Sequence, residues 1–145
     1  MRAEFPNLSE QYIKDPSLSL YAKAGFESIA YSDGDEVENR LLSTVRAADD
    51  RSLYSAEIES AITDWPSEYH LSRNRHVLLR PLNIKPGDRV LEVGCGLGAL
   101  TRYLGELGAN VVAVEGSLMR ARIAAERCAD PVSYTHLTLP TTPYV

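Results

Sequence analysis

The sequence has few of the residues that mark disulfide-rich, metal-binding, membrane-spanning or nucleic-acid-binding proteins. Its 145 residues include two cysteines, Cys95 and Cys128, and three histidines, in no spacing typical of a zinc site or a disulfide framework. No apolar run approaches the about 18 residues of a spanning helix, so we expect no membrane segment. A formal net charge of −5 gives no electrostatic reason to expect a nucleic acid as partner.

The N-terminus also lacks the apolar core of a secretory signal peptide, so we expect a cytoplasmic protein. With 44% hydrophobic and 24% charged residues, the composition is typical of a soluble globular chain. The length suffices for one domain with a modest core.

The first part of the chain is predicted to be an irregular arm followed by helices. Prolines and glycines interrupt residues 1–35, so we expect a loosely ordered arm with one short helix near 18–24. Residues 36–87 are predicted to be a helical lead-in. Its helices are expected over 36–49, over 55–65 with Ser55 as cap and Pro66 as terminator, and from Ser72 to Pro81. Trp65 is expected to be a core anchor.

The pattern changes at residue 88. The runs RVLEV and NVVAVE indicate two buried parallel strands, at 89–93 and 110–115. Each is followed by a segment of helical spacing, near 99–107 and 118–128. This β-α-β-α order over residues 88–130 predicts the start of an open α/β sheet.

A glycine-rich loop, EVGCGLG, lies where the first of these strands turns into a helix. Glycine permits a tight reversal and the close approach of a ligand, which binds beyond the carboxyl ends of the strands. Gly94, Gly96 and Ala99 satisfy the dinucleotide pattern G-x-G-x-x-G/A. However, Glu92 would meet an anionic pyrophosphate badly and would suit the sulfonium and ammonium groups of S-adenosylmethionine. Glu115, which ends the second strand, can bind ribose hydroxyls in either case.

The segment VLEVGCGLGALTRYLGELGANVVAVEGS resembles the N-terminal half of class I S-adenosyl-L-methionine-dependent methyltransferases. The resemblance extends over about residues 60–128 and implies a truncated Rossmann-like sheet, of which the first two βα units are present. It implies that the loop contacts the methionine part and adenosine and that the acid after strand two holds the ribose. The cofactor-binding residues implied are Glu92, Gly94, Cys95 (through its backbone), Gly96, Gly98, Glu115, Gly116 and Ser117.

The preceding segment, DWPSEYHLSRNRHVLLRPL, is similar to the lead-in of bacterial methyltransferases, some of them fused to or encoded with glycosyltransferases. This similarity implies a glycan-related methyl acceptor and an association with a glycosyltransferase. It also makes Tyr69, His70 and Arg73 candidates for cofactor contacts, although surface polar residues on a packed helix are the interpretation we favour.

Several other polar residues are given structural roles. Arg120, Arg122 and Arg127 are expected to form a solvated helix face, with Glu126 available for an ion pair. Cys128 is expected to be a small core residue.

The region in which such enzymes keep catalytic residues has no counterpart in this sequence, so no catalytic residue is assigned. We therefore expect a fragment that binds cofactor weakly or not at all and is inactive by itself. The alternatives are a fragment of an NAD-type dinucleotide-binding oxidoreductase and a non-catalytic S-adenosylmethionine-binding protein.

Residues 131–145 resemble translated adapter sequence at the end of metagenomic reading frames, and we predict that they are not native. The alternative is a genuine third strand, which the three prolines would restrict to a short segment at the sheet edge.

Sequencing the source DNA through the Asp130 codon tests this prediction. We expect the reading frame to continue into further strand–helix units. A native frame that encodes THLTLPTTPYV at its end would show that the tail belongs to the protein.

Overall fold

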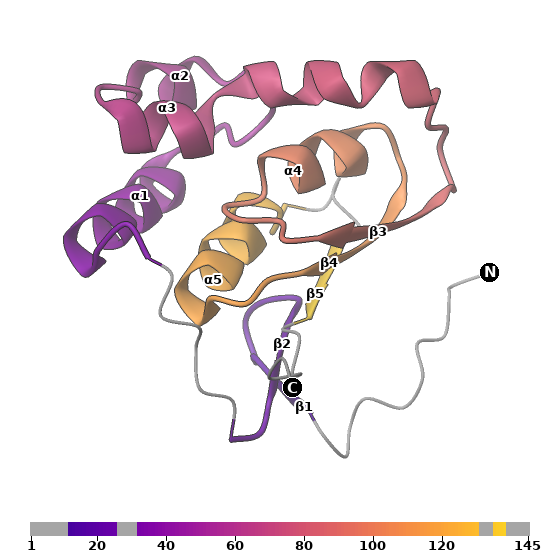
Figure 1. The fold of residues 1–145 in the computed structure, drawn as a ribbon, viewed down its shortest axis with the longest axis horizontal. Coiled ribbons are helices and arrows are strands. Elements are labelled where there is room, and N and C mark those ends of the chain that lie inside the picture. The colour runs from indigo at the N-terminus through magenta and orange to yellow at the C-terminus, as the bar shows by residue number, and fades with distance from the viewer. Residues whose placement is uncertain (1–11, 26–31, 131–134, 139–145) are drawn as a thin grey trace.

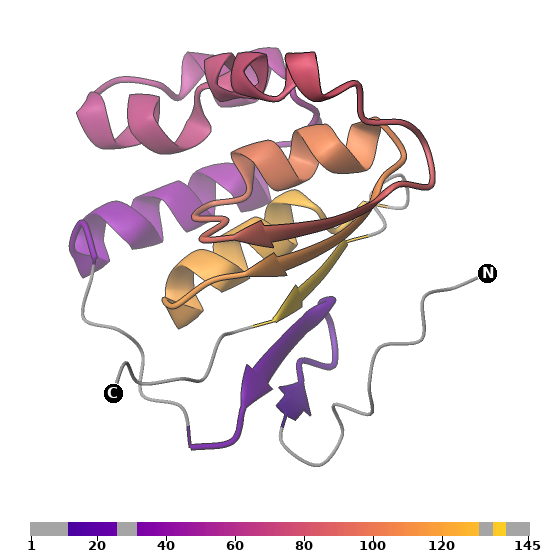
Figure 2. The ribbon, with the colours of Figure 1, turned by 45° about the vertical axis from the view of Figure 1, so that its right-hand side comes forward.

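The computed structural model describes residues 12–25, 32–130 and 135–138. Its five strands form one sheet in the order β1-β2-β5-β4-β3. The described helices lie over one face of this sheet, with α4 and α5 next to the strands and the α2–α3 region outside them (Figures 1 and 2). No helix among these residues is both long and apolar enough to cross a membrane.

The predicted β-α-β-α unit is confirmed. Strands β3 (Arg89–Val93) and β4 (Asn110–Val114) are parallel and in register over their whole length. Helix α4 (Ala99–Glu106) connects them, and helix α5 (Leu118–Arg127) follows β4. Buried alanines let α5 pack closely on the sheet, so this unit forms a compact apolar core.

Strand β3 lies at the end of the described sheet, as expected for a sheet without its next strand. Its side chains alternate: Leu91 and Val93 are 66% and 78% exposed, whereas Glu92 is partly buried on the helix side. Within the described ranges, no helix covers the face that bears the two apolar side chains.

The predicted short helix near residues 18–24 is wrong. These residues contribute strand β2 (Leu20–Lys23), which pairs antiparallel with β1 (Tyr12–Lys14) and parallel with β5. Asp15 stabilises the turn between β1 and β2, because its carboxylate accepts hydrogen bonds from the backbone N–H and the hydroxyl of Ser17. The rest of the predicted arm, residues 1–11 and 26–31, lies outside the described residues.

The expected edge position of the tail segment is also wrong. Strand β5 (Thr135–Thr138) lies between β4 and β2, parallel to both. A proline-free strand of four residues retains all its backbone N–H groups, so it can pair on both sides. Whether residues 131–145 are native is not decided by this pairing and stays a prediction.

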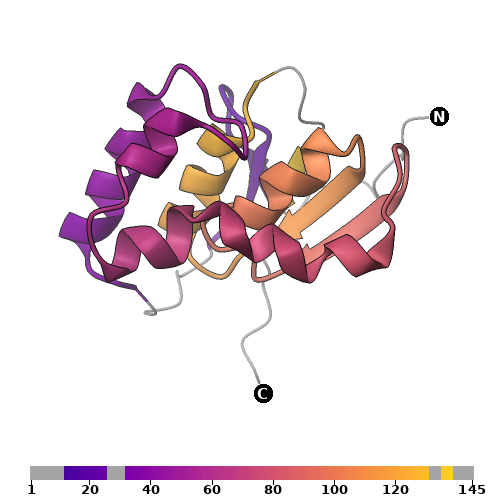
Figure 3. The ribbon, with the colours of Figure 1, turned by 90° about the horizontal axis from the view of Figure 1, so that it is seen from above.

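The helical lead-in is confirmed as helical, with different boundaries. It comprises α1 (Asp35–Ala47), α2 (Ala56–Ser60), α3 (Trp65–Leu71) and the 3-10 helices η2 (Arg73–Leu78) and η3 (Arg80–Leu82). Seen from above, α1 lies beside α5, and the segment from α3 to η3 runs past α4 (Figure 3). Ser55 and Ser72 accept backbone hydrogen bonds as the predicted caps.

The prediction that Pro66 ends a helix is wrong, because Pro66 lies in the first turn of α3, where its missing N–H costs nothing. Asp64 and Ser67 form a reciprocal capping box that begins this helix. As a consequence, Trp65 stands at the start of α3 and is 67% exposed, so it is not a core anchor.

Two of the three arginines expected on a solvated face are buried. Arg127 is fully buried and donates to the carbonyl oxygens of His70 and Leu71, so it ties the end of α3 to α5. Burial lowers the pKa of its guanidinium to about 10. Arg122 is the exposed member, and Glu126 forms its ion pair with Arg46, at 2.7 Å.

Gly98 fixes the distance between the glycine loop and α5. Its φ of +78° lies in the left-handed region, and a Cβ there would stand 3.0 Å from both Cα and Cβ of Ala124. A side chain at Gly98 would therefore be strained and would also push α5 away.

Replacing Gly98 by alanine is expected to lower the free energy of unfolding by about 2–4 kcal/mol, from strain plus overpacking. Gly25→Ala is the matched control: its φ of +73° is similar, but nothing lies within 4 Å of the added Cβ. Urea unfolding followed by circular dichroism measures both. Equal losses in the two variants would contradict the close contact with α5.

Candidate functional site

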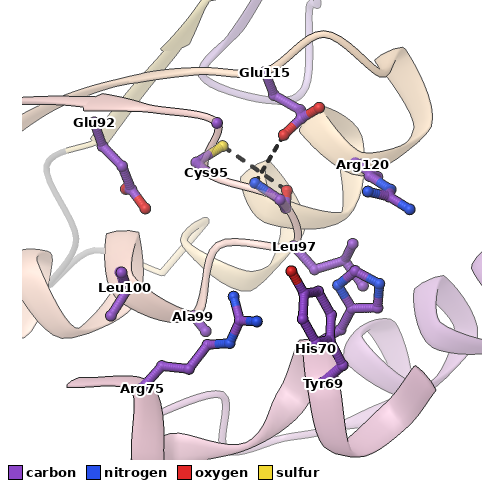
Figure 4. A pocket seen from close by; sticks show the side chains of 12 residues that line it. Tyr69, His70, Arg75, Glu92, Cys95, Leu97, Ala99, Leu100, Glu115 and Arg120 are labelled. Carbon is purple, nitrogen blue, oxygen red and sulfur yellow. Dashed lines mark hydrogen bonds between the residues drawn. The ribbon is translucent and has the colours of Figure 1, made fainter. Parts of the chain in front are cut away.

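A cavity of about 310 Å³ lies between the glycine loop, the end of β4 and the wall formed by α3 and η2 (Figure 4). It therefore lies at the carboxyl ends of the parallel strands, where open α/β sheets bind ligands. Its lining residues are Tyr69, His70, Arg75, Glu92, Gly94, Cys95, Gly96, Leu97, Ala99, Leu100, Glu115 and Arg120.

Glu92 projects into this cavity from β3. The Thr101 hydroxyl of α4 donates a hydrogen bond of 2.6 Å to its carboxylate. Burial raises the pKa of Glu92 to about 7, and the Thr101 hydrogen bond opposes the shift, while the neighbouring charge of Glu115 adds to it. The cavity thus holds a carboxyl group that a bound cation would ionise.

Glu115 follows β4 and turns back over the glycine loop. One of its carboxylate oxygens accepts from the backbone N–H of Gly96 at 2.8 Å (Figure 4). The other accepts from Ser117 N–H at 2.9 Å. Each carboxylate oxygen has two lone pairs, so both retain capacity for a hydroxyl donor. The two backbone bonds orient the carboxylate before any ligand arrives.

The three alternate glycines have two different roles. Gly94 and Gly96 line the cavity, and a Cβ added at either would meet nothing within 4 Å, so the space above them is open to a ligand. Gly98 packs against α5 instead. Cys95 lines the cavity between the open glycines, and burial raises the pKa of its thiol, which stays protonated and unreactive.

The predicted adenine-side residues are not in the cavity wall. Gly116 and Ser117 are not among its lining residues. Ser117 instead caps α5, its hydroxyl accepting from the backbone N–H of Arg120. The predicted contacts of Gly116 and Ser117 with a cofactor therefore lie outside this cavity and stay predictions.

The opposite wall is formed by α3 and η2. Tyr69 and His70 line it. The favoured interpretation as a surface residue is wrong for His70, which is buried, and it holds for Tyr69, which is exposed. Arg73 points elsewhere, toward Glu59 and the ring of Tyr54. Arg75 takes its place: its guanidinium lies 3.9 Å from the ring centre of Tyr69 and faces the cavity (Figure 4).

A buried polar network supports this wall. His70 Nε2 lies 2.7 Å from the carboxylate of Asp33, which also accepts from Arg120 at 2.8 Å. Arg120 donates in addition to the buried Glu38 of α1, at 3.0 Å. Burial lowers the pKa of His70, with Asp33 opposing the shift, so the imidazole is neutral near pH 7 and its Nε2 proton is donated to Asp33.

Five of the eight cofactor residues predicted from the sequence line this one cavity: Glu92, Gly94, Cys95, Gly96 and Glu115. The sequence-based prediction missed Arg75 and Arg120. Nothing in the pattern distinguishes Arg75 from Arg73, since the 3-10 turn of η2 decides which of them faces the loop. Arg120 was misassigned because its acidic partners lie more than 80 residues away in the chain.

Comparison with known proteins yields short but consistent similarities. Ubiquinone biosynthesis O-methyltransferase of Ruegeria sp. (strain TM1040) is 46% identical over 55 residues, 36% of this chain and 22% of that protein. Protein-L-isoaspartate O-methyltransferase of Methylorubrum extorquens (strain PA1) is 43% identical over 54 residues, 34% of this chain and 24% of that protein. The chain thus spans about a quarter of the length of the curated relatives it matches.

Among solved structures, an S-adenosylmethionine-dependent methyltransferase from Geobacter sulfurreducens, in complex with S-adenosyl-L-homocysteine, gives a TM-score of 0.37 at 19% identity. The match covers 71% of this chain and 36% of that one.

The sequence model of a family described as "Methyltransferase domain" matches residues 62–144, more than half of the chain, and includes the cavity and all of its predicted residues. The chain therefore belongs to the methyltransferase-domain family.

Proposed function

We propose that the cavity binds S-adenosyl-L-methionine and that the whole enzyme transfers its methyl group to an acceptor. The observation that carries the proposal is the pair of carboxylates, Glu92 and Glu115, that face one cavity across two open glycines. This arrangement suits a ligand with a cationic end and a ribose, and is unfavourable for a pyrophosphate. Family membership likewise favours methyl transfer over the oxidoreductase alternative.

In this proposal each end of the cofactor has its own partner. Glu92 binds the ammonium group of the methionine part, and Glu115 accepts from the ribose hydroxyls with lone pairs that its backbone donors leave free. Gly94 and Gly96 allow close approach. Contacts through the backbone of Cys95, and of Gly116 and Ser117 near the adenine, remain predictions.

Arg75 is the cavity residue best suited to the carboxylate of the methionine part. Its guanidinium lies over the Tyr69 ring. Among the described residues, this guanidinium has no hydrogen-bond or ion-pair acceptor. A guanidinium on one wall and carboxylates on the other match the opposite charges of an amino-acid end. Arg75 therefore replaces Arg73 as the proposed contact.

When bound, the cofactor supplies an electrophilic methyl group, and the contribution of this chain is to position it. We assign no catalytic base to the described residues. The relatives differ both in the atom that is methylated and in the acceptor, so they favour no particular substrate. A glycan-related acceptor, an associated glycosyltransferase, a bacterial origin and a cytoplasmic location stay predictions.

Binding of S-adenosyl-L-homocysteine is expected to tighten about tenfold between pH 6 and pH 8. The pKa of Glu92 is about 7, and a ligand ammonium group prefers the ionised carboxylate. Calorimetry or ligand-detected NMR measures the ratio, even where binding is weak. Glu92→Gln should remove the pH dependence, whereas Glu36→Gln, an exposed acid at the start of α1, should keep it. Tight binding of NADH without any response to S-adenosyl-L-homocysteine would contradict the proposal.

Glu92→Gln is also expected to stabilise the ligand-free protein at pH 8. The folded pKa of about 7 exceeds the ordinary 4.5, so the folded state holds a proton that the unfolded state has lost. Stability therefore falls as pH rises from 4.5 through 7, by at most about 3 kcal/mol. The amide of the variant keeps an acceptor for Thr101 and does not titrate. Urea unfolding should show that the free energy of unfolding rises by about 1–3 kcal/mol at pH 8 and does not change at pH 4.5. A lower free energy of unfolding at pH 8 would show that burial of the ionised carboxylate does not destabilise the protein.

A further inference from the structure

An exposed aromatic stack lies at the start of α3, next to the cavity. The rings of Trp65 and Tyr69 are nearly parallel, with an angle of 22° and 5.1 Å between their centres. Trp65 is 67% exposed and Tyr69 is 42% exposed. Both rings are therefore accessible to a ligand that lies beside the cavity.

The stack is continuous with the cavity wall. Tyr69 contacts the indole of Trp65 and also the guanidinium of Arg75, and both Tyr69 and Arg75 line the cavity (Figure 4). The capping box at Asp64 and Ser67 fixes where α3 begins, and with it the position of Trp65. A flat group lying on Trp65 would thus be one helical turn away from the cavity that holds the proposed cofactor.

The polar group next to Trp65 is already engaged within the protein. One oxygen of Asp64 accepts from the backbone and hydroxyl of Ser67, and the other accepts from Arg40 at 2.5 Å. A sugar ring needs hydrogen-bond partners for its hydroxyl groups around the stacking face. An aromatic ring needs the flat face alone, so this surface favours an aromatic ligand.

We propose that Trp65 and Tyr69 bind an aromatic ring of the methyl acceptor. This inference rests on the proposed function and specifies its substrate class: acceptors with a planar aromatic ring, which stacks on the indole while the rest of the acceptor reaches the cavity along Tyr69. The location fits the requirement that donor and acceptor be held side by side for an in-line transfer.

The test uses the fluorescence of Trp65, which is the single tryptophan of the chain. The full chain is titrated with catechol and, separately, with methyl α-D-glucopyranoside, with and without S-adenosyl-L-homocysteine. Catechol is expected to quench the emission saturably, and the glucoside is expected to have no effect. Quenching that stays linear, as for free N-acetyltryptophanamide, or saturable quenching by the glucoside alone, would overturn the proposal.

Variants identify the binding surface by saturation-transfer NMR of catechol. Trp65→Leu should weaken binding about tenfold, and Trp65→Phe, which keeps a flat ring, should retain most of it. Tyr54→Leu is the matched control, because Tyr54 is a similarly exposed aromatic residue, at 59%, that does not line the cavity. Unchanged binding in Trp65→Leu, or an equal loss in Tyr54→Leu, would show that catechol does not use this stack.

The two proposals fail separately. Binding of S-adenosyl-L-homocysteine without saturable catechol binding would contradict the aromatic acceptor surface and leave the cofactor site intact. Catechol binding that depends on Trp65, without any S-adenosyl-L-homocysteine binding, would instead support the ring-binding surface and contradict the cofactor assignment on which its role rests.

Discussion

The parallel pairing of β3 with β4 is the constraint on which the rest of the site depends. Because Val93 pairs with Val114, the chain leaves both strands at the same level, and the loops that follow must share one space. This brings two carboxylates, Glu92 and Glu115, to one cavity. Burial, with a smaller contribution from the charge of Glu115, raises the pKa of Glu92, so its ionised form is unfavourable without a cation. A ligand with a positive end would stabilise the ionised carboxylate of Glu92, and this stabilisation would contribute to the free energy of binding.

The second wall of the cavity is held by buried arginines together with an apolar cluster that includes Leu71 of α3. Arg127 binds the last carbonyl groups of α3, and Arg120 joins α5 to Asp33 and Glu38. Buried charged groups of this kind add little net stability, but removing one leaves its partners unpaired, so they fix one arrangement of the helices. Apolar packing of α1 against α5 and the glycine loop, through residues such as Leu97, complements them. The position of the C-terminal end of α3 over the loop is therefore specified by both arginines, Arg127 directly and Arg120 through Asp33 and His70.

The parts of this structure that sequence could predict are those controlled by local periodicity. Glu92 and Glu115 could be placed because Glu92 lies near the end of an apolar strand and Glu115 directly follows one, and both strands have clear boundaries. Trp65 and Arg127 could not, since a capping box and pairing across more than 50 residues decide their environment. The β1–β2 hairpin was missed for the same reason: Leu20 is buried by strand pairing and packing, not by a pattern of its own segment. Local periodicity thus predicts the glycine loop, whereas tertiary contacts determine the wall that lies opposite it.

The central claim is that the glycine loop and Glu115 together recognise the nucleoside part of an S-adenosyl ligand. The backbone amide of Gly96 reports on it directly, because its N–H is donated to the Glu115 carboxylate that would also receive the ribose hydroxyls. A ¹⁵N-resolved NMR titration with S-adenosyl-L-homocysteine is therefore the most direct measurement. The account predicts large shifts of the Gly94, Gly96 and Ser117 amides and none at Gly108, which precedes β4 at the opposite end of the strands. Ligand-dependent shifts confined to other parts of the chain would contradict it.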